Sequence, residues 1–319
     1  MTAAQAVQAW RVAARFAAIL LLLPSAATAA GESTSNPFAR GAAFDRVFVV
    51  AHAGASSIAP QNTLVAGEAA FALGADAWGV DVRVTSDGRL VLMHDETLDR
   101  TTNVEDVFPD RAPWRVADFT LEEVRRLDAG TWFAEVDPFG KIASGHVSPE
   151  EAAGFVGEPV PTLEEALEFV AATDWLIDIE VKAPPVEARG HVVARLVELI
   201  EATGTDDHVL VSSFDHDFLR EFRAIAPSVP IGALALLPTS GLVEYLDAIQ
   251  ADVYLPSVVG FTPPLLEELE QAGFQVILWT YNTIDSLEYA LDLPGIDGIY
   301  TDYPQRLVPL LRTLTEDAP

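Results

Sequence analysis

Short aliphatic runs alternate with amphipathic helical patterns from Val47 to the end of the chain, and this alternation restricts the fold more than any other feature. The runs have the length and the β-branched composition of strands. They cover residues 47–52, 77–84, 89–94, 175–182, 208–214, 230–236, 252–257, 275–280 and 298–302. Because helical patterns separate most of these runs, the sequence predicts βα units and a parallel sheet.

One pair of runs departs from this alternation. Residues 77–84 and 89–94 are joined only by the stretch TSDG, which is too short for a parallel crossover and contains a hairpin signal. In an antiparallel hairpin with a two-residue or a four-residue loop, side-chain alternation would place Gly79, Asp81 and His94 on one face. Eight strands then remain in βα order, and eight βα units in about 290 residues predict an α/β fold, a (β/α)8 TIM-type barrel.

Residues 101–161 lack a strong strand pattern and are long for a connection. We therefore expect a small insertion after the His94 hairpin, over one mouth of a barrel that spans residues 46–315. Two stretches, Thr120 to Glu123 and Thr162 to Glu165, fit the capping box. Each predicts the start of a helix.

The first residues have the composition of a secretory signal peptide. Arg11 and Arg15 precede an apolar run, Phe16 to Leu23, and small residues follow it. This order is typical of a cleaved leader, whereas an apolar run of this length is too short for a transmembrane anchor. We expect a signal peptide over residues 1–29, a flexible segment over 30–45, and a secreted or periplasmic protein.

The formal net charge of −29 at pH 7 restricts the partners of the chain. Such a surface repels phosphate backbones, so nucleic acid is excluded as a partner. The chain has no cysteine, so export brings no disulfide bond. We expect a small-molecule partner and no stable membrane insertion, and the sequence leaves the oligomeric state open.

Polar residues gather where the predicted barrel strands end. These residues are His52, Asp81, Glu180, Lys182, Ser213, Trp279 and Asp302. Catalytic residues of such barrels come from the strand ends, so the pattern predicts a single site. Two histidines are suited to paired acid and base catalysis. Carboxylates suit a hard cation such as Ca²⁺ or Mg²⁺, which stabilises charge on a phosphoryl group.

Several stretches resemble the glycerophosphodiester phosphodiesterases in order and spacing, from about Phe48 to Pro304. They are VVAHAGASSIAPQNTL, GVDVRVTSDGRLVLMHDETLDRTTN, VPTLEEAL, IDIEVK, VLVSSFD and ILWTYNTIDS followed by GIDGIYTDYP. The resemblance implies a (β/α)8 barrel with a small inserted subdomain. It also implies a metal-dependent hydrolase that converts deacylated phospholipids to sn-glycerol 3-phosphate and an alcohol.

The resemblance assigns roles to individual residues. His52 and His94 match the two catalytic histidines of the family. Asp81 and Glu180 match two of its metal-binding carboxylates. Lys182 matches the lysine near the substrate phosphate. In addition, Trp279 fits the aromatic residue that walls the pocket.

Three positions depart from the family pattern. Ala53 stands in place of an arginine, Gln61 in place of a glutamate, and Gly79 in place of a metal-binding glutamate. We expect Glu96 to be a further candidate for the metal above Gly79. We expect Arg83 to bind substrate and to supply part of the positive charge lost at Ala53.

The departures leave alternative functions open. One is a catalytically weakened or inactive barrel that acts as a secreted phosphodiester-binding protein, because one metal ligand is missing. Another is a phospholipase D-type toxin related to the same barrel. Toxins of that group typically rely on disulfide bonds, and this chain contains no cysteine.

Overall fold

The computed structural model describes residues 36–316 except 43 and 45. The predicted signal peptide, residues 1–29, lies outside the described residues. The segment over 30–45 that we expect to be flexible is described only in part, and its described residues contact the barrel. The Phe38 side chain is buried in the barrel core, and the Asn36 amide donates to the carbonyl oxygen of Val209 at 2.8 Å. An aromatic residue this far inside the core holds the segment in place.

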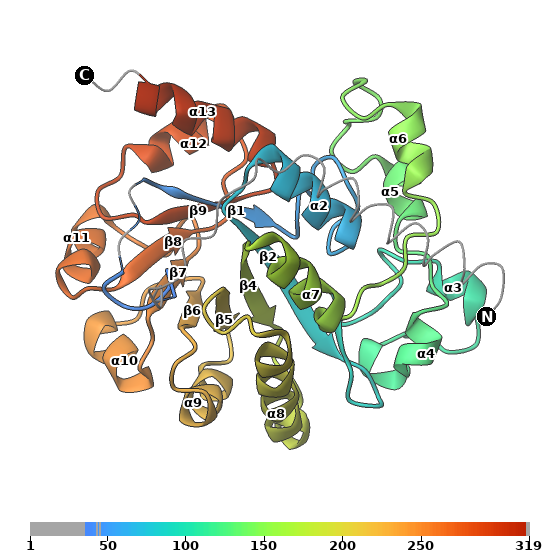
Figure 1. Cartoon of the computed structure of the whole chain (residues 1–319), viewed down its shortest axis with the longest axis horizontal. Coiled ribbons are helices and arrows are strands. Elements are labelled where there is room, and N and C mark those ends of the chain that lie inside the picture. Colours follow the sequence, from blue (N-terminus) through green and yellow to red (C-terminus); the bar gives the residue numbers. More distant parts are fainter. Residues whose placement is uncertain (1–35, 43, 45, 317–319) are drawn as a thin grey trace. The chain divides into compact units, whose positions relative to one another are not determined.

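Eight parallel strands form a closed barrel, as predicted. Around it the order is β1-β9-β8-β7-β6-β5-β4-β2, and β1 pairs with β2 to close it (Figure 1). The remaining strand, β3, pairs with the carboxyl-terminal half of β2. The strands are β1 (Phe48–His52), β2 (Ala77–Val84), β3 (Leu90–Leu92), β4 (Leu176–Val181), β5 (Val209–Ser213), β6 (Ile231–Ala235), β7 (Val253–Pro256), β8 (Gln275–Leu278) and β9 (Gly298–Thr301).

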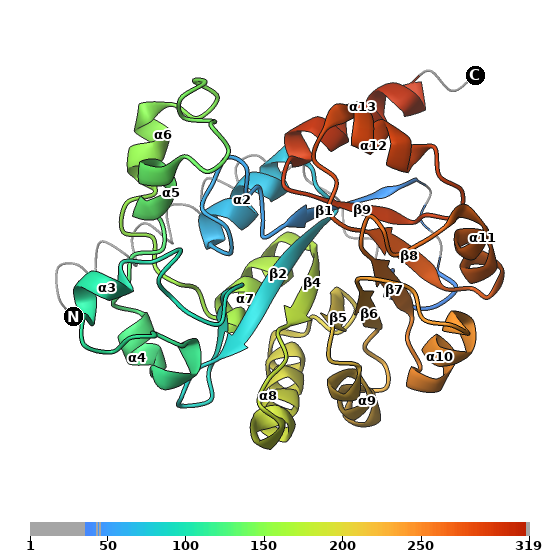
Figure 2. The same ribbon diagram turned by 180° about the vertical axis from the view of Figure 1, so that it is seen from behind.

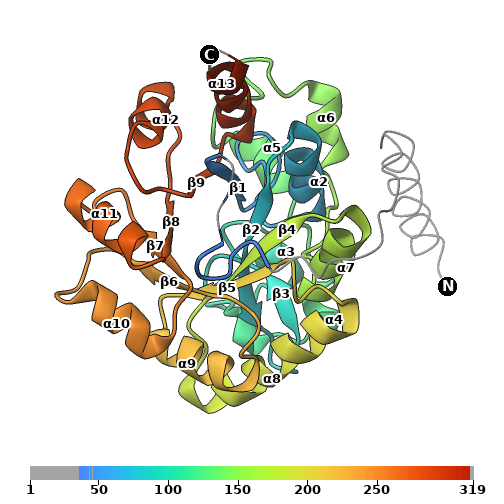
Figure 3. The same ribbon diagram turned by 60° about the vertical axis from the view of Figure 1, so that its left-hand side comes forward.

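Long helices cover the outside of the barrel, and Figure 3 shows them around the strands. They are α2 (Leu64–Leu73), α7 (Leu163–Thr173), α8 (Val186–Thr203), α9 (His216–Ile225), α10 (Leu242–Ile249), α11 (Pro263–Gln271), α12 (Ile284–Leu291) and α13 (Pro304–Glu316). Within the described ranges, no helix combines the length and the apolar composition that crossing a membrane requires.

The β2–β3 hairpin has a different register from both predicted ones. Val84 pairs with Leu90 and Val82 with Leu92, and Gly88 has a φ of 76°. This is a three-residue loop with a left-handed glycine at its end, which the sequence prediction did not consider. Alternation alone would direct His94 away from Asp81. Because β3 ends at Leu92, the chain bends before His94 and the side chain still reaches the barrel mouth.

Five short helical segments form the predicted insertion. They are α3 (Val104–Val107), η1 (Val116–Asp118), α4 (Leu121–Val124), α5 (Thr131–Val136) and α6 (Pro149–Gly154). Both predicted capping boxes are present, at the starts of α4 and α7. Phe133 and Phe155 pack against Ala59 and Ala66, in and just after the connection that follows β1. The insertion therefore flanks the carboxyl-terminal side of the barrel near α2 (Figure 2).

Candidate active site

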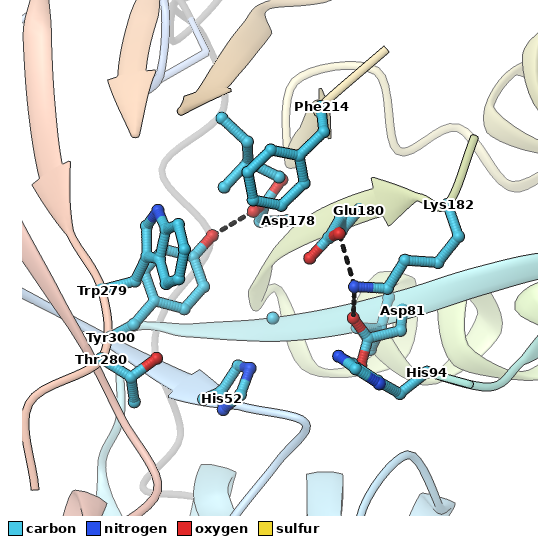
Figure 4. A pocket seen from close by; sticks show the side chains of 13 residues that line it. His52, Asp81, His94, Asp178, Glu180, Lys182, Phe214, Trp279, Thr280 and Tyr300 are labelled. Carbon is cyan, nitrogen blue, oxygen red and sulfur yellow. Dashed lines mark hydrogen bonds and ion pairs between the residues drawn. The ribbon is translucent and has the colours of Figure 1, made fainter. Parts of the chain in front are cut away.

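A cavity of about 170 Å³ opens where the barrel strands end, and it brings together six of the residues predicted for the site (Figure 4). These six are His52, Asp81, His94, Glu180, Lys182 and Trp279. Arg83 and Glu96 do not line this cavity. Its lining also includes Asp178, Phe214 and Tyr300, which the sequence prediction left out.

Two carboxylates and one ammonium form the charged centre of the cavity. Asp81 and Glu180 are partners in the β2–β4 register. Lys182 Nζ lies 2.8 Å from Asp81 Oδ1 and also donates to Glu180 Oε1, so that the ammonium lies between the two carboxylates (Figure 4). The other oxygen of Asp81 accepts a hydrogen bond from the Asn62 amide at 2.7 Å. Neighbouring strand ends thus direct opposite charges to one point.

The pKa values of these groups follow from burial and charge. Burial raises the pKa of Asp81, but Lys182 and the two histidines outweigh it and hold the pKa well below its usual range. Burial, and then the charge of Asp81, raise the pKa of Glu180 despite Lys182. Burial lowers the pKa of Lys182, but the two carboxylates outweigh it, so the pKa rises and the ammonium stays charged.

The arrangement fits a divalent cation with two protein carboxylates. Asp81 and Glu180 already converge on one positive group, and carboxylate oxygens are what Ca²⁺ and Mg²⁺ prefer. Among the residues that the structure describes, no group of three or more His, Asp or Glu side chains has metal-ligating spacing. A cation here would be held by Asp81 and Glu180, and it would compete with the Lys182 ammonium.

The side chain of Tyr300 explains the glycine in β2. A Cβ atom on Gly79 would lie 2.8 Å from Cε1 of the Tyr300 ring and 3.2 Å from Cγ1 of Val50. Real Cβ atoms essentially never approach a neighbour as closely as 2.8 Å. The space above Gly79 is thus filled by an aromatic ring that comes from β9. A glycine inside a strand often marks such a close approach.

Glu96 does not reach this space. Its carboxylate pairs with Arg115 at 3.2 Å, and the Glu96 side chain is 71% exposed. Arg83 lines a second cavity of about 420 Å³, which shares Lys182 with the first, and its Nε donates to the carbonyl oxygen of His94 at 3.0 Å. The structure therefore places Arg83 and Glu96 beside the main cavity and not in it.

His52 is held by a network of polar groups. Its Nδ1 lies 2.7 Å from Asp302 Oδ1, which also accepts from the Ser56 hydroxyl, while Asn282 donates to the second oxygen of Asp302 at 2.6 Å. Since Nδ1 faces a carboxylate, it carries a proton and leaves Nε2 to exchange one. Burial lowers the pKa of His52, but Asp302 outweighs it and the net pKa is raised.

His94 has a similar support from the other side of the cavity. Its Nδ1 lies 2.7 Å from Asp95 Oδ1, and Arg100 donates to the other oxygen of Asp95. Arg100 also donates to the Gln61 amide oxygen at 3.3 Å. One of the three departures from the family pattern, Gln61, therefore lies at the far end of the network that orients His94.

We expect Asp302→Asn to lower the pKa of His52 towards or below the ordinary histidine value of about 6.5. The substitution keeps the shape but removes the negative charge that favours imidazolium. The same charge stabilises the fold while His52 is protonated, so this contribution is full below about pH 6.5 and lost as pH rises through the raised pKa. NMR titration of the His52 ring measures the shift. An unchanged pKa in the variant would show that Asp302 does not control the proton.

Asp178 and Tyr300 form the floor of the cavity. Asp178 pairs in register with Gly79, two residues before Glu180 on the same face of β4. The Tyr300 and Ser212 hydroxyls both donate to Asp178 Oδ2. Burial raises the pKa of Asp178 to about 7. The sequence could have indicated Asp178, because it lies two residues before Glu180 and so faces the same side of the strand. The contact with Tyr300 depends instead on the pairing of distant strands.

Comparisons with known proteins agree with this geometry. The sequence model of the glycerophosphoryl diester phosphodiesterase family matches residues 52–306. A glycerophosphodiester phosphodiesterase from Caldanaerobacter subterraneus is 36% identical over 270 residues, which cover 84% of this chain and 98% of the relative. A glycerophosphodiester phosphodiesterase from Bacillus altitudinis is 35% identical over 264 residues, which cover 82% of this chain and 96% of the relative.

A solved structure is similar as well. It is an Oleispira antarctica phosphodiesterase in complex with the product sn-glycerol-3-phosphate. It aligns with a TM-score of 0.68 at 25% identity, over 83% of this chain and 96% of that chain. With the barrel, the paired histidines and the family match taken together, the chain belongs to the glycerophosphoryl diester phosphodiesterase family, whose members are phosphoric diester hydrolases.

Proposed function

We propose that this protein hydrolyses glycerophosphodiesters, the deacylated phospholipids, to sn-glycerol 3-phosphate and an alcohol. The observation that carries the proposal is the pair of histidines, each oriented by its own carboxylate, that face one cavity with Lys182. Two such groups supply an acid and a base at the same phosphorus centre. The product complex of the Oleispira antarctica relative supports the same substrate class.

The reaction has two steps that use the same histidines. In the first, one histidine accepts the proton of the 2-hydroxyl of glycerol as its oxygen bonds to phosphorus. The other histidine gives a proton to the alcohol oxygen as the P–O bond breaks. In the second, the roles reverse, and water opens the cyclic phosphate to sn-glycerol 3-phosphate. Each positioned group contributes about 10²–10⁴-fold.

Lys182 and the carboxylates set the charge around the phosphate. Lys182 lines both cavities, and its ammonium, between the two carboxylates, can pair with a phosphoryl oxygen. Asp81 and Glu180 would hold a Ca²⁺ or Mg²⁺ ion, which supplies positive charge to the phosphoryl group when bound. The Nε1–H of Trp279 donates a hydrogen bond to the carbonyl oxygen of Leu255 at 2.8 Å, and the ring lines the cavity.

Hydrolysis of glycerophosphocholine by the purified protein tests the proposal. We expect release of choline and sn-glycerol 3-phosphate in the presence of a divalent cation. A protein that binds glycerophosphocholine in calorimetry without turning it over would instead be the secreted phosphodiester-binding protein. Absence of both binding and turnover would reject the substrate class.

Removal of the cation is expected to abolish hydrolysis, and Ca²⁺ or Mg²⁺ is expected to restore it. Asp81→Asn should weaken cation binding by at least about 10–100-fold, because it removes one of only two carboxylate ligands. Calorimetric titration with Ca²⁺ alone measures this without reference to activity. Equal affinity in the parent and in Asp81→Asn would contradict the assignment of Asp81.

We also propose that the protein acts outside the cytoplasm. The order of residues 1–29 supports a cleaved leader. Mass spectrometry of the protein recovered from the growth medium or periplasm should show an N-terminus near residue 30. Recovery only of the uncleaved chain from the cytoplasm would contradict export.

A further inference from the structure

The floor of the cavity holds a carboxylate that the proposed reaction does not use. Asp178 is 2% exposed and lines the cavity two residues before Glu180 along β4, one inward-facing layer deeper. The side-chain period of a strand separates these two layers by about 6.6 Å. The Asp178 carboxylate is therefore too deep to contact a group bound between Asp81 and Glu180. A short chain attached to such a group could still reach it.

The two oxygens of Asp178 have different surroundings. Oδ2 accepts from both the Ser212 hydroxyl, at 3.0 Å, and the Tyr300 hydroxyl. Oδ1 is buried and has no hydrogen-bond partner among the residues that the structure describes. Because two donors fix Oδ2, the carboxylate cannot turn to satisfy Oδ1 without losing them. A buried acceptor without a partner is costly, so a ligand that donates to it is favoured.

The surroundings of Oδ1 select the chemistry of that ligand. The rings of Phe214 and Trp279 pack edge to face, with their centroids 5.8 Å apart. They form an apolar wall across the cavity from His94 (Figure 4). The combination of an apolar wall and an acceptor without a partner suits a narrow carbon chain that ends in a hydroxyl. In an extended glycerol phosphate, five bonds separate the terminal hydroxyl oxygen from the phosphorus, a span comparable with the separation of the two layers, about 6.6 Å.

We propose that Asp178 determines specificity by accepting a hydrogen bond from the terminal hydroxyl of the substrate glycerol. The inference deepens the proposed function and rests on it for the identity of the polyol. The glycerol end then lies on the floor, the phosphate lies beside Lys182, and the alcohol head group leaves through the mouth.

Binding of two phosphate monoesters tests this inference without turnover. The first ligand is sn-glycerol 3-phosphate, and the second is propane-1,2-diol 1-phosphate, which lacks only the terminal hydroxyl. Calorimetry on the purified protein, at a pH above the pKa of Asp178 of about 7, should give about 10- to 100-fold tighter binding of the first, the range for a hydrogen bond to a charged acceptor. Asp178→Ala should bind both equally.

Two further variants guard against a purely structural effect. Asp178→Asn keeps the volume and both hydroxyl bonds, because its amide oxygen can face Ser212 and Tyr300. Its amide nitrogen then takes the place of Oδ1 and donates, so the substrate hydroxyl must accept instead. The preference should fall to about 3- to 10-fold, since this hydrogen bond has no charged partner and an uncharged hydrogen bond is about half as strong. Asp297→Asn alters a partly buried carboxylate that accepts from the Val276 N–H at 2.7 Å and does not line the cavity. It should keep the parent preference.

The outcomes separate this inference from the proposed function. A preference that persists in Asp178→Ala, or a parent protein that binds the two ligands equally or binds neither, overturns the role of Asp178. A preference that Asp178→Ala abolishes supports that role even where the parent protein fails to hydrolyse glycerophosphocholine. In that last case the proposed hydrolysis is rejected, and the proposal that Asp178 binds the glycerol hydroxyl is retained.

Discussion

Replacing His52 by alanine is expected to lower kcat for glycerophosphocholine hydrolysis by about 10²- to 10⁴-fold, the contribution of one positioned acid or base. The variant keeps Lys182 and the two carboxylates that surround it, so ground-state binding of the phosphate is largely retained. The loss should therefore fall on kcat more than on KM. Steady-state kinetics of the purified variant at saturating substrate measures it.

Two comparisons give this result its meaning. His146→Ala removes an exposed histidine of the insertion, whose Nδ1 lies 3.0 Å from the Ser144 hydroxyl, and it should leave kcat unchanged. The double variant His52→Ala/His94→Ala should lose far less than the product of the single losses, because the histidines act as a unit. A decrease smaller than about tenfold for His52→Ala would contradict acid or base catalysis by this residue.

The barrel could be predicted because its signals are local. Each of the nine strands lies where an aliphatic run predicts one, and the helix starts at Thr120 and Thr162 follow from residues three apart. The convergence of His52, Asp81, Glu180 and Trp279 follows from the same pattern, since strand ends meet at one mouth.

The hairpin shows where a correct expectation had the wrong reason. Side-chain alternation predicts that His94 shares a face with Asp81 only for loops of even length, and the loop has three residues. His94 reaches the cavity because the strand ends two residues earlier. Loop geometry of this kind depends on the left-handed conformation of Gly88, which a sequence permits without requiring it.

The contacts of the cavity floor lay beyond prediction for a different reason. Tyr300 and Asp178 come from β9 and β4, which are not adjacent in the barrel, and the Tyr300 hydroxyl reaches across to the Asp178 carboxylate. Side-chain alternation in a single sequence indicates that both residues face the inside of the barrel. It does not show which of several long side chains crosses the barrel and fills the space left by a glycine.

Introducing glutamate at position 79, which restores the residue type of the family motif, is expected to destabilise the protein. A Cβ atom at this position meets the Tyr300 ring at 2.8 Å, and the added carboxylate would stand on the strand position that pairs with Asp178 and lies two residues before Asp81. Overpacking and an uncompensated buried charge should lower the free energy of unfolding by about 3–5 kcal/mol. Urea denaturation measures the loss, and hydrolysis should fall and not recover.

A double-mutant cycle with Tyr300 tests whether the ring is the cause. Gly79→Ala should cost about 1–3 kcal/mol in the parent, since a single methyl group already meets the ring. In the Tyr300→Leu background, where Cε1 is absent, the same substitution should cost clearly less, because only the 3.2 Å approach to Cγ1 of Val50 remains. Additive effects of the two changes would show that the ring does not require the glycine. A large coupling would mean that Gly79 and Tyr300 are one structural unit, so that the missing carboxylate cannot be restored without removing the tyrosine that holds Asp178.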